Sequence, residues 1–105
     1  MVCEIKTKDE FEEIIEDSEG KLIVIQFTAV WCKPCKKILP KLKELSIKYG
    51  NTYCFKVDAD KVEELTNKFN VKTLPTFLFY KNGKKLDECS GADTKKLEDM
   101  INKYN

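Results

Sequence analysis

Two cysteines in a Cys-x-x-Cys arrangement are the residues of this sequence whose types and spacing point most directly to chemistry. Cys32 and Cys35 are separated by Lys33 and Pro34, and Trp31 precedes them. Such a pair can bind a metal, form a structural disulfide or exchange disulfides with other molecules. The rest of the sequence has to decide among these three roles.

The metal and the structural disulfide are the weaker interpretations. Zinc takes four ligands, usually from two close pairs, but this chain has one such pair, no histidine, and three isolated cysteines: Cys3, Cys54 and Cys89. A disulfide that closes so short a loop removes little entropy from the unfolded chain. We therefore expect no bound metal, and we expect the isolated cysteines to be spectators, with Cys54 in a strand and Cys3 and Cys89 more exposed.

The position of the pair favours redox chemistry. An apolar, β-branched run at Leu22–Phe27 predicts a buried strand, and apolar residues recur at helical spacing after Cys32. Cys32 is then expected at the N-terminus of a helix, where the partial positive charge favours a thiolate. That thiolate can attack a disulfide, and Cys35, one helical turn along, can resolve the mixed disulfide.

The remaining pattern predicts helices that alternate with strands. The predicted strands are Leu22–Phe27, Tyr53–Val57, Phe77–Tyr80 and Leu86–Cys89. The predicted helices carry apolar residues at helical spacing: Phe11, Ile14 and Ile15; Ile38, Leu42, Leu45 and Tyr49; Val62, Leu65 and Phe69; and Leu97, Met100, Ile101 and Tyr104. Strands separated by helices usually pair in parallel. We therefore expect an α/β fold in which a central mixed sheet carries helices on both faces.

Local signals mark two of the element ends. Thr7 followed by Glu10 fits a capping box, in which each side chain accepts a hydrogen bond from a backbone N–H near the start of the helix. The segment Lys81–Lys84, which contains Asn-Gly, predicts a tight hairpin turn. The last two strands are therefore expected to pair antiparallel.

The composition of the chain argues against a nucleic-acid partner and against a membrane protein. The chain has 105 residues, a length that suits one domain, and its net charge is +1. It contains no arginine, the residue on which nucleic-acid readers depend most, so no nucleic-acid partner is expected. No apolar run is long enough to cross a membrane, and the first residues do not resemble a signal peptide. The expected location is the cytoplasm, without membrane association.

A family resemblance supports the redox interpretation. The segment Phe27–Lys36, FTAVWCKPCK, resembles the active-site motif of the thioredoxin family. The similarity continues at Val57–Asp60, Thr73–Phe77, Lys81–Gly83 and Ser90–Ala92, and it covers essentially the whole chain. The resemblance implies one thioredoxin-like domain over residues 1–105 that has the thioredoxin fold and reduces protein disulfides without a bound cofactor.

The resemblance also implies roles for the residues around the cysteine pair. By similarity, Cys32 is the attacking thiol and Cys35 the resolving thiol. Trp31 and Pro34 look like parts of the flat surface around them.

Further along the chain, Pro75 resembles the cis-proline that lies beside the disulfide in the family. Leu74, which precedes it, is expected to offer its backbone to an extended substrate segment, as in β-strand addition. Gly91 and Ala92 look like the far wall of the same shallow groove.

The sequence departs from the family at two positions. Gln26 stands where thioredoxins usually carry a buried aspartate that helps to move the proton of the resolving cysteine. Glutamine cannot ionise, and a buried amide needs a partner, so we expect Gln26 to accept a hydrogen bond from Lys56 or from a water. Lys33 stands where most members have glycine. Its cation should favour the Cys32 thiolate and make the protein more oxidising.

The predicted function is therefore thiol–disulfide exchange with disulfide-containing protein substrates. The resemblance implies that an NADPH-dependent thioredoxin reductase restores the dithiol, and a monomer is expected. Two alternatives remain open at this point: a specialised oxidase or isomerase, and a binding subunit that uses the same surface without turnover.

Overall fold

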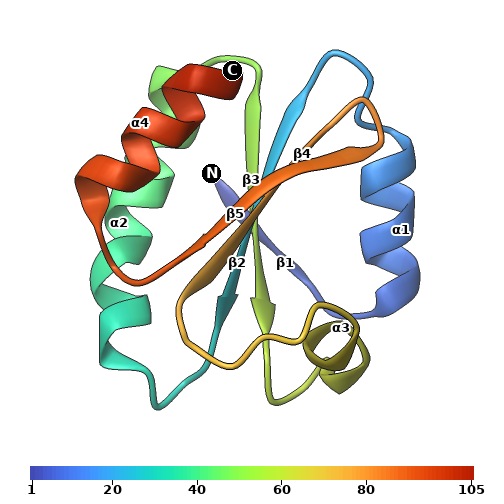
Figure 1. Cartoon of the computed structure of the whole chain (residues 1–105), viewed down its shortest axis with the longest axis vertical. Helices are drawn as coiled ribbons and strands as arrows, with labels where there is room; N and C mark the ends of the chain where they lie inside the picture. The colour runs from blue at the N-terminus through green and yellow to red at the C-terminus, as the bar shows by residue number, and fades with distance from the viewer.

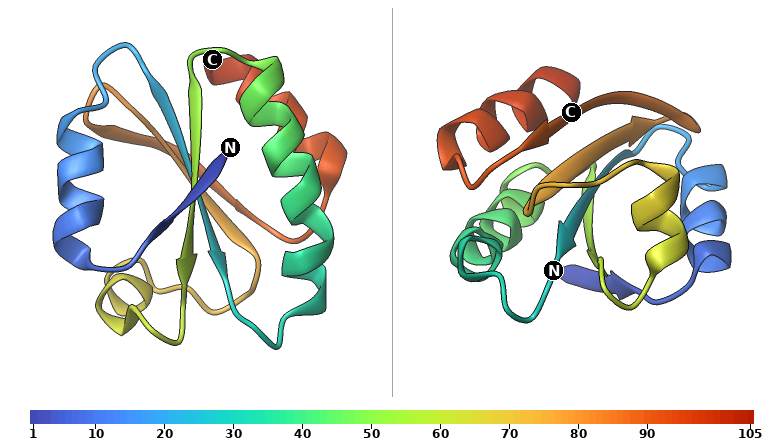
Figure 2. Two further views of the ribbon diagram at one scale, coloured as in Figure 1. Left: turned by 180° about the vertical axis from the view of Figure 1, so that it is seen from behind. Right: turned by 60° about the horizontal axis from the view of Figure 1, so that its bottom comes forward.

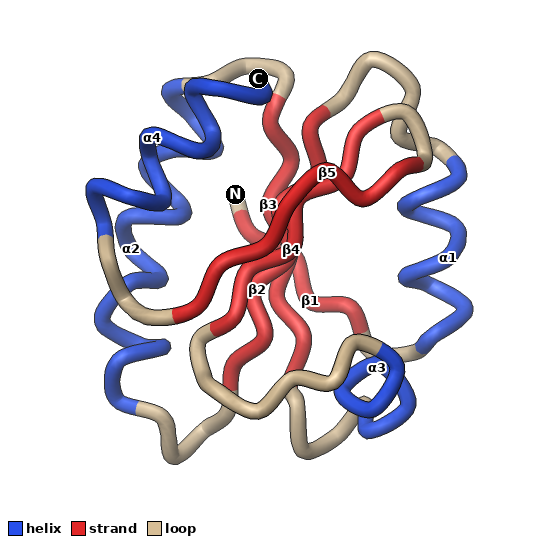
Figure 3. The backbone as a smooth tube through the Cα atoms, viewed as in Figure 1, coloured by secondary structure: helices blue, strands red, loops and turns tan.

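The computed structural model describes residues 1–105 and contains five strands and four helices, which alternate along the chain except where β5 directly follows β4 (Figures 1 and 3). In chain order they are β1 (Val2–Ile5), α1 (Lys8–Glu16), β2 (Leu22–Thr28), α2 (Lys33–Lys48), β3 (Thr52–Asp58), α3 (Glu63–Lys68), β4 (Thr76–Lys81), β5 (Lys84–Ser90) and α4 (Thr94–Tyr104). None of these helices is long and apolar enough to cross a membrane.

The strands form one mixed sheet in the order β1-β3-β2-β4-β5. β2 lies at its centre, parallel to β3 and antiparallel to β4. β3 pairs in parallel with β1, and β4 pairs antiparallel with β5. The thioredoxin fold expected from the sequence is therefore confirmed.

The first strand was missing from the sequence-based prediction, which began with a helix. β1 has only four residues, and its side chains do not alternate cleanly between apolar and polar types. A strand this short at the edge of a sheet gives too weak a pattern for a periodicity argument. Its pairing with β3 makes it the outer strand of the parallel half of the sheet.

Helices cover both faces of the sheet (Figure 2), and an apolar core lies under the helices on each face. Side chains alternate between faces along a strand, so Ile25 of β2 packs in the core with Phe11 of α1 and Leu65 of α3. Val24 of β2 packs in the other core with Leu42 of α2 and other residues of α2 and α4. The near-continuous apolar run of β2 is thus explained by burial on both faces.

The predicted helix start and hairpin turn are both present, with one difference. Thr7 caps α1 by accepting the N–H of Glu10 at 3.1 Å, but the Glu10 carboxylate accepts the N–H of Lys6 rather than that of Thr7. Between β4 and β5, Asn82 and Gly83 have φ values of 53° and 76°, the backbone that an Asn-Gly turn adopts.

Candidate active site

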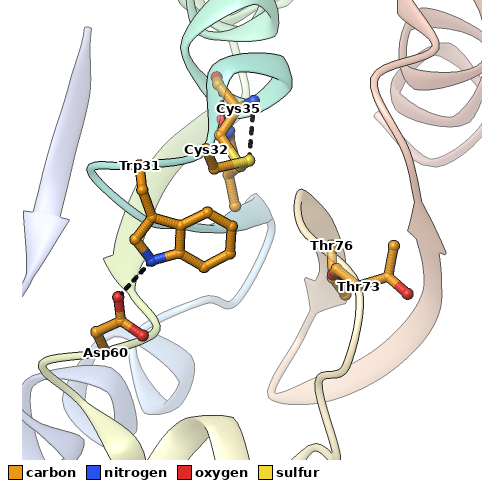
Figure 4. Close-up of a disulfide and its surroundings, with 7 residues drawn as sticks. Trp31, Cys32, Cys35, Asp60, Thr73 and Thr76 are labelled. Atoms are coloured by element: carbon orange, nitrogen blue, oxygen red, sulfur yellow. Dashed lines mark hydrogen bonds between the residues drawn. A yellow bond between two sulfur atoms is a disulfide. The ribbon is translucent and has the colours of Figure 1, made fainter.

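Cys32 and Cys35 form a disulfide at the N-terminus of α2, on the turn that follows the central strand β2 (Figure 4). Cys32 is the residue immediately before the helix, and its sulfur accepts the N–H of Cys35 at 3.3 Å. Backbone N–H groups at a helix N-terminus have no intrahelical partner and carry partial positive charge. A sulfur in this position is therefore held where negative charge is stabilised.

Both cysteines are almost covered, but their neighbours are open to solvent. Cys32 and Cys35 are 3% and 1% exposed, whereas the adjacent Val30 and Trp31 are 70% and 66% exposed. Large apolar side chains this exposed are typical of surfaces that bind other molecules. Lys33 and Pro34 are exposed as well.

Trp31 is held in place by a residue that had no assigned role in the sequence-based prediction. Its indole N–H donates to Asp60 Oδ2 at 2.8 Å (Figure 4). Asp60 follows β3, and its own N–H donates to Asp58 Oδ1 at 2.9 Å. The sequence did contain a signal for this contact, because β2 and β3 could be predicted as neighbouring parallel strands. The residues that follow the carboxyl ends of such strands, here Trp31 and Asp60, meet at one edge of the sheet.

The loop before β4 packs against the cysteines. The Leu74–Pro75 peptide bond is cis, as expected, and Leu74 packs against the small buried cluster of Ala29, Cys32 and Cys35. Pro75 is buried.

Gly91 approaches this loop from the end of β5. Its N–H donates to the Pro75 carbonyl at 2.8 Å, and its φ of +96° favours glycine. Thr76 fixes the loop further, because its hydroxyl donates to the Thr73 carbonyl at 2.5 Å and lies 3.1 Å from the Ser90 hydroxyl. Ala92, the next residue after Gly91, is exposed.

Gln26 lies beneath the first turn of α2. It is 1% exposed, and its Nε2 donates to the Cys35 carbonyl at 3.1 Å. Its Oε1 has no hydrogen-bond partner among the atoms of the protein. The hydrogen bond expected from Lys56 is therefore wrong, because the amide binds the backbone of α2 instead; acceptance from a water stays a prediction.

The other three cysteines lie away from the pair and form no disulfide. Burial raises the pKa of Cys54 to about 12 and that of Cys89 to about 11. Both groups therefore stay protonated at neutral pH, and a protonated thiol is not a nucleophile. The expectation that Cys89 is exposed was wrong: its side chain points from β5 into the core beneath α2 and α4.

Comparisons with known proteins agree with this geometry. The thioredoxin family model matches residues 2–103. Human thioredoxin is 43% identical over 102 residues, which cover 97% of both chains. The solved structure of thioredoxin from Fasciola hepatica is 38% identical and has a TM-score of 0.94, with coverage of 98% of this chain and 99% of the other. That of Schistosoma mansoni thioredoxin is 44% identical and has a TM-score of 0.92, with coverage of 99% and 95%.

The matches run across the cysteine pair and every element that positions it. The fold, the disulfide at the helix N-terminus and the sequence similarity all indicate the same chemistry, the reduction of disulfides by dithiol exchange. The chain therefore belongs to the thioredoxin family and is a thiol–disulfide oxidoreductase.

Proposed function

We propose that Cys32 is the attacking thiolate and Cys35 the resolving thiol in the reduction of protein disulfides. The observation that carries this assignment is the Cys32–Cys35 disulfide at the start of α2, with Cys32 as the helix cap. The cap residue lies where the helix N-terminus stabilises a thiolate. Cys32 is also the cysteine next to the exposed Trp31, which supports its role as the one that meets substrate.

The electron count of the reaction follows from thiol–disulfide exchange. The Cys32 thiolate attacks one sulfur of the substrate disulfide, the substrate S–S bond breaks, and the other substrate sulfur leaves with the bonding pair. Cys35 then loses its proton and attacks the sulfur of Cys32. The bond between Cys32 and the substrate breaks, so the substrate ends with two reduced sulfurs and the chain with the disulfide seen here.

The substrate segment is proposed to bind in an extended form beside Leu74. The backbone N–H and C=O of Leu74 make no hydrogen bond within the protein, so both are free to pair with another chain as in β-strand addition. Trp31 and Pro34 would bound this segment on the α2 side, and Gly91 and Ala92 on the other. The hydrogen bond from Gly91 to Pro75 supports this arrangement because it holds Gly91 against the loop that carries Leu74.

Lys33 is proposed to shift the redox equilibrium. It is exposed and makes no ion pair or hydrogen bond through its ammonium group, so its charge can act on the neighbouring Cys32 thiolate. Lys33→Gln should make the protein more reducing when it is equilibrated with a glutathione couple. Lys37→Gln, the same change one turn further along α2, is the control and should have a smaller effect. High salt should weaken the Lys33 effect.

An NADPH-dependent thioredoxin reductase is the proposed partner that restores the dithiol, and the chain is proposed to act as a monomer. The proposed compartment is the cytoplasm. The presence of three cysteines that form no disulfide supports a reducing environment.

The test is the reduction of insulin disulfides driven by dithiothreitol. The unmodified chain should turn over, Cys32→Ser should abolish turnover, and Cys35→Ser should trap a mixed disulfide through Cys32. Cys3→Ser is the matched control and should retain turnover, because Cys3 lies away from the pair. Turnover that survives in Cys32→Ser would contradict the assignment. A strongly oxidising potential would favour the oxidase or isomerase, and a biological effect that survives loss of both cysteines would favour the binding subunit.

A further inference from the structure

The solvent-exposed side of α2 carries lysines whose charge no neighbouring acid neutralises. With 3.6 residues per helical turn, exposed lysines gather on the side of the helix that faces away from the core, and we call this set the lysine face: Lys33, Lys36, Lys37 and Lys43. Glu44 is the one acidic residue of α2, and it forms an ion pair with Lys41. The lysine face is therefore a positively charged surface.

The stability of the fold does not explain these lysines. None of the four ammonium groups makes an ion pair or a hydrogen bond within the protein. By contrast, Lys41 and Lys48 of the same helix both pair with Glu98 of α4. Lys33 and Lys36 also lie in the first turn of α2, where a helix favours acidic side chains and where this helix has none. Their positions therefore oppose the helix dipole.

The lysine face begins at the disulfide. Lys33 directly follows Cys32, the residue that caps α2, and the other lysines of the face continue along the helix. On the other side of the cysteine pair, the exposed Lys72 borders a hollow that is shared by Trp31 and Leu74. A protein whose disulfide reaches Cys32 would therefore place the residues around that disulfide close to positive charge.

Negative charge is concentrated elsewhere, on α1. Five of the nine residues of this helix are acidic, and one is a lysine. α1 and α2 lie on opposite sides of the molecule (Figure 1) and pack in different cores. The net charge of +1 thus results from two separated regions of opposite charge, and the positive region is the one that adjoins the disulfide.

We propose that the lysine face docks proteins whose reducible disulfide is bordered by acidic residues. Complementary charges on two surfaces increase the population of the encounter complex in which the disulfide of the partner meets Cys32. A protein is favoured over a nucleic acid because the face adjoins the reactive cysteines and contains no arginine. This inference rests on the function proposed above, and it adds the class of protein that the site selects.

The experiment compares peptides that share one sequence around an intramolecular disulfide and differ only in the flanking residues, which are glutamate, glutamine or lysine. The reduced full-length chain acts on each peptide, and the second-order rate constant is measured by acid quenching and chromatography. At low ionic strength the glutamate peptide should react about fivefold to tenfold faster than the glutamine peptide, and the lysine peptide more slowly than both. These differences should nearly disappear in about 1 M salt, where the Debye length is about 3 Å.

The double variant Lys36→Glu/Lys37→Glu reverses two charges of the lysine face and should remove or invert the preference for the glutamate peptide. Each rate constant is divided by that for bis(hydroxyethyl) disulfide, an uncharged reagent, so that any change in the Cys32 thiolate cancels. Lys33 is left unchanged because its charge is proposed to act on that thiolate. If the double variant does not fold, Lys43→Glu and the salt dependence of the unmodified chain provide the same test.

The matched control is Lys84→Glu/Lys103→Glu, which changes the net charge by the same amount. Lys84 begins β5 and Lys103 lies in the last turn of α4. The end of β4 pairs with Leu22 at the start of β2, and Lys81 Nζ donates to the Tyr104 carbonyl at 3.0 Å. Both control sites therefore lie at the end of the sheet opposite the start of α2 (Figure 1), and this variant should keep the preference.

The outcomes separate this inference from the proposed function. A preference for the glutamate peptide that salt weakens, that Lys36→Glu/Lys37→Glu removes and that the control keeps would support docking on the lysine face. Equal rate constants for the glutamate and glutamine peptides at low salt, or an equal loss of preference in both double variants, would overturn it. Equal rate constants together with tight binding of a DNA duplex would overturn it in favour of a nucleic-acid partner. Failure of the proposed function would instead appear as no reduction of any peptide.

Discussion

The indole of Trp31 donates its N–H to Asp60 Oδ2 across 2.8 Å, which ties the exposed ring beside the disulfide to the turn after β3. Trp31 is 66% exposed, so packing alone does not hold it in one orientation. The hydrogen bond therefore decides where the ring lies relative to the sulfur of Cys32.

Asp60→Ala should release the ring. We expect insulin turnover to fall about twofold to fivefold, since the lost hydrogen bond corresponds to about 0.5–1 kcal/mol at an exposed site. The chain has one tryptophan, so its fluorescence reports the change directly. Asp60→Asn is the control because it keeps an acceptor oxygen and removes the charge. Unchanged emission and turnover in Asp60→Ala would show that the bond does not position the ring.

Gln26→Asp should make stability depend on pH. The introduced carboxyl would be buried, and burial raises the pKa of a carboxyl group above its value in the unfolded chain. A group with a raised folded-state pKa is stabilising below its unfolded pKa, and that stability is lost as the pH rises through the folded pKa. The urea concentration at the unfolding midpoint of the variant, relative to that of the unmodified chain, should therefore decrease as the pH is raised from about 4 to about 8.

The same variant tests whether residue 26 affects the reaction. A carboxylate at this position, beneath the first turn of α2 where Gln26 now lies, could accept the Cys35 proton, which Gln26 cannot do. Insulin turnover should therefore increase and its pH profile should change. If turnover and the titration of the cysteines both stay the same, residue 26 has no catalytic consequence.

Glu98 should make the contact between α2 and α4 sensitive to acid. Its carboxylate accepts hydrogen bonds from Lys48 Nζ at 2.6 Å and from Lys41 Nζ at 3.1 Å, and these hydrogen bonds lower the pKa of Glu98 to about 2. A lowered folded-state pKa contributes stability above the unfolded value of about 4.5, and this stability is lost as the pH falls towards 2.

Glu98→Gln should therefore lower the melting temperature slightly at pH 7, and the difference from the unmodified chain should vanish near pH 2. Added salt should shrink the difference at pH 7, because these groups are near solvent. Asp99→Asn is the control, since Asp99 pairs only with Lys95 on its own helix. An equal effect of Glu98→Gln at both pH values would contradict the ion pairs as its cause.

The isolated cysteines should differ in reactivity. Cys3 is exposed, whereas burial raises the pKa of Cys54 to about 12 and that of Cys89 to about 11. Iodoacetamide at pH 8 should label Cys3 in the folded, oxidised protein and leave the other two unmodified. Peptide mass spectrometry measures this, and all three should react in urea. Fast labelling of Cys54 in the folded protein would contradict its burial.

The sequence predicted the elements whose patterns are long and regular. The central strand and the helix after it were identified because Leu22–Phe27 is apolar apart from Gln26 and the apolar residues from Ile38 to Tyr49 follow helical spacing. In the structure the predicted strand Tyr53–Val57 is longer by one residue at each end and spans Thr52–Asp58. The ends of a strand depend on its hydrogen bonds to neighbouring strands, which the sequence of one segment does not reveal.

What the sequence did not predict depends on tertiary contacts. β1 is too short to show a period. The partner of Gln26 depends on which face of β2 lies under α2, and the hydrogen bond from Trp31 to Asp60 joins residues 29 positions apart. The spacing of apolar residues predicts one helix or strand at a time, so it does not predict contacts between these elements. The cis bond before Pro75 was expected from family resemblance alone.

The outer strand β5 differs from the strands inside the sheet because charged side chains dominate its exposed residues. Its first five residues are Lys84-Lys85-Leu86-Asp87-Glu88, and its pairing with β4 shifts register between Phe79 and Tyr80. Charges and irregular pairing at a sheet edge discourage two copies from joining edge to edge. The chain that is proposed to accept extended segments of other proteins at Leu74 thus has, at this border, a strand unsuited to pairing with a second copy of itself.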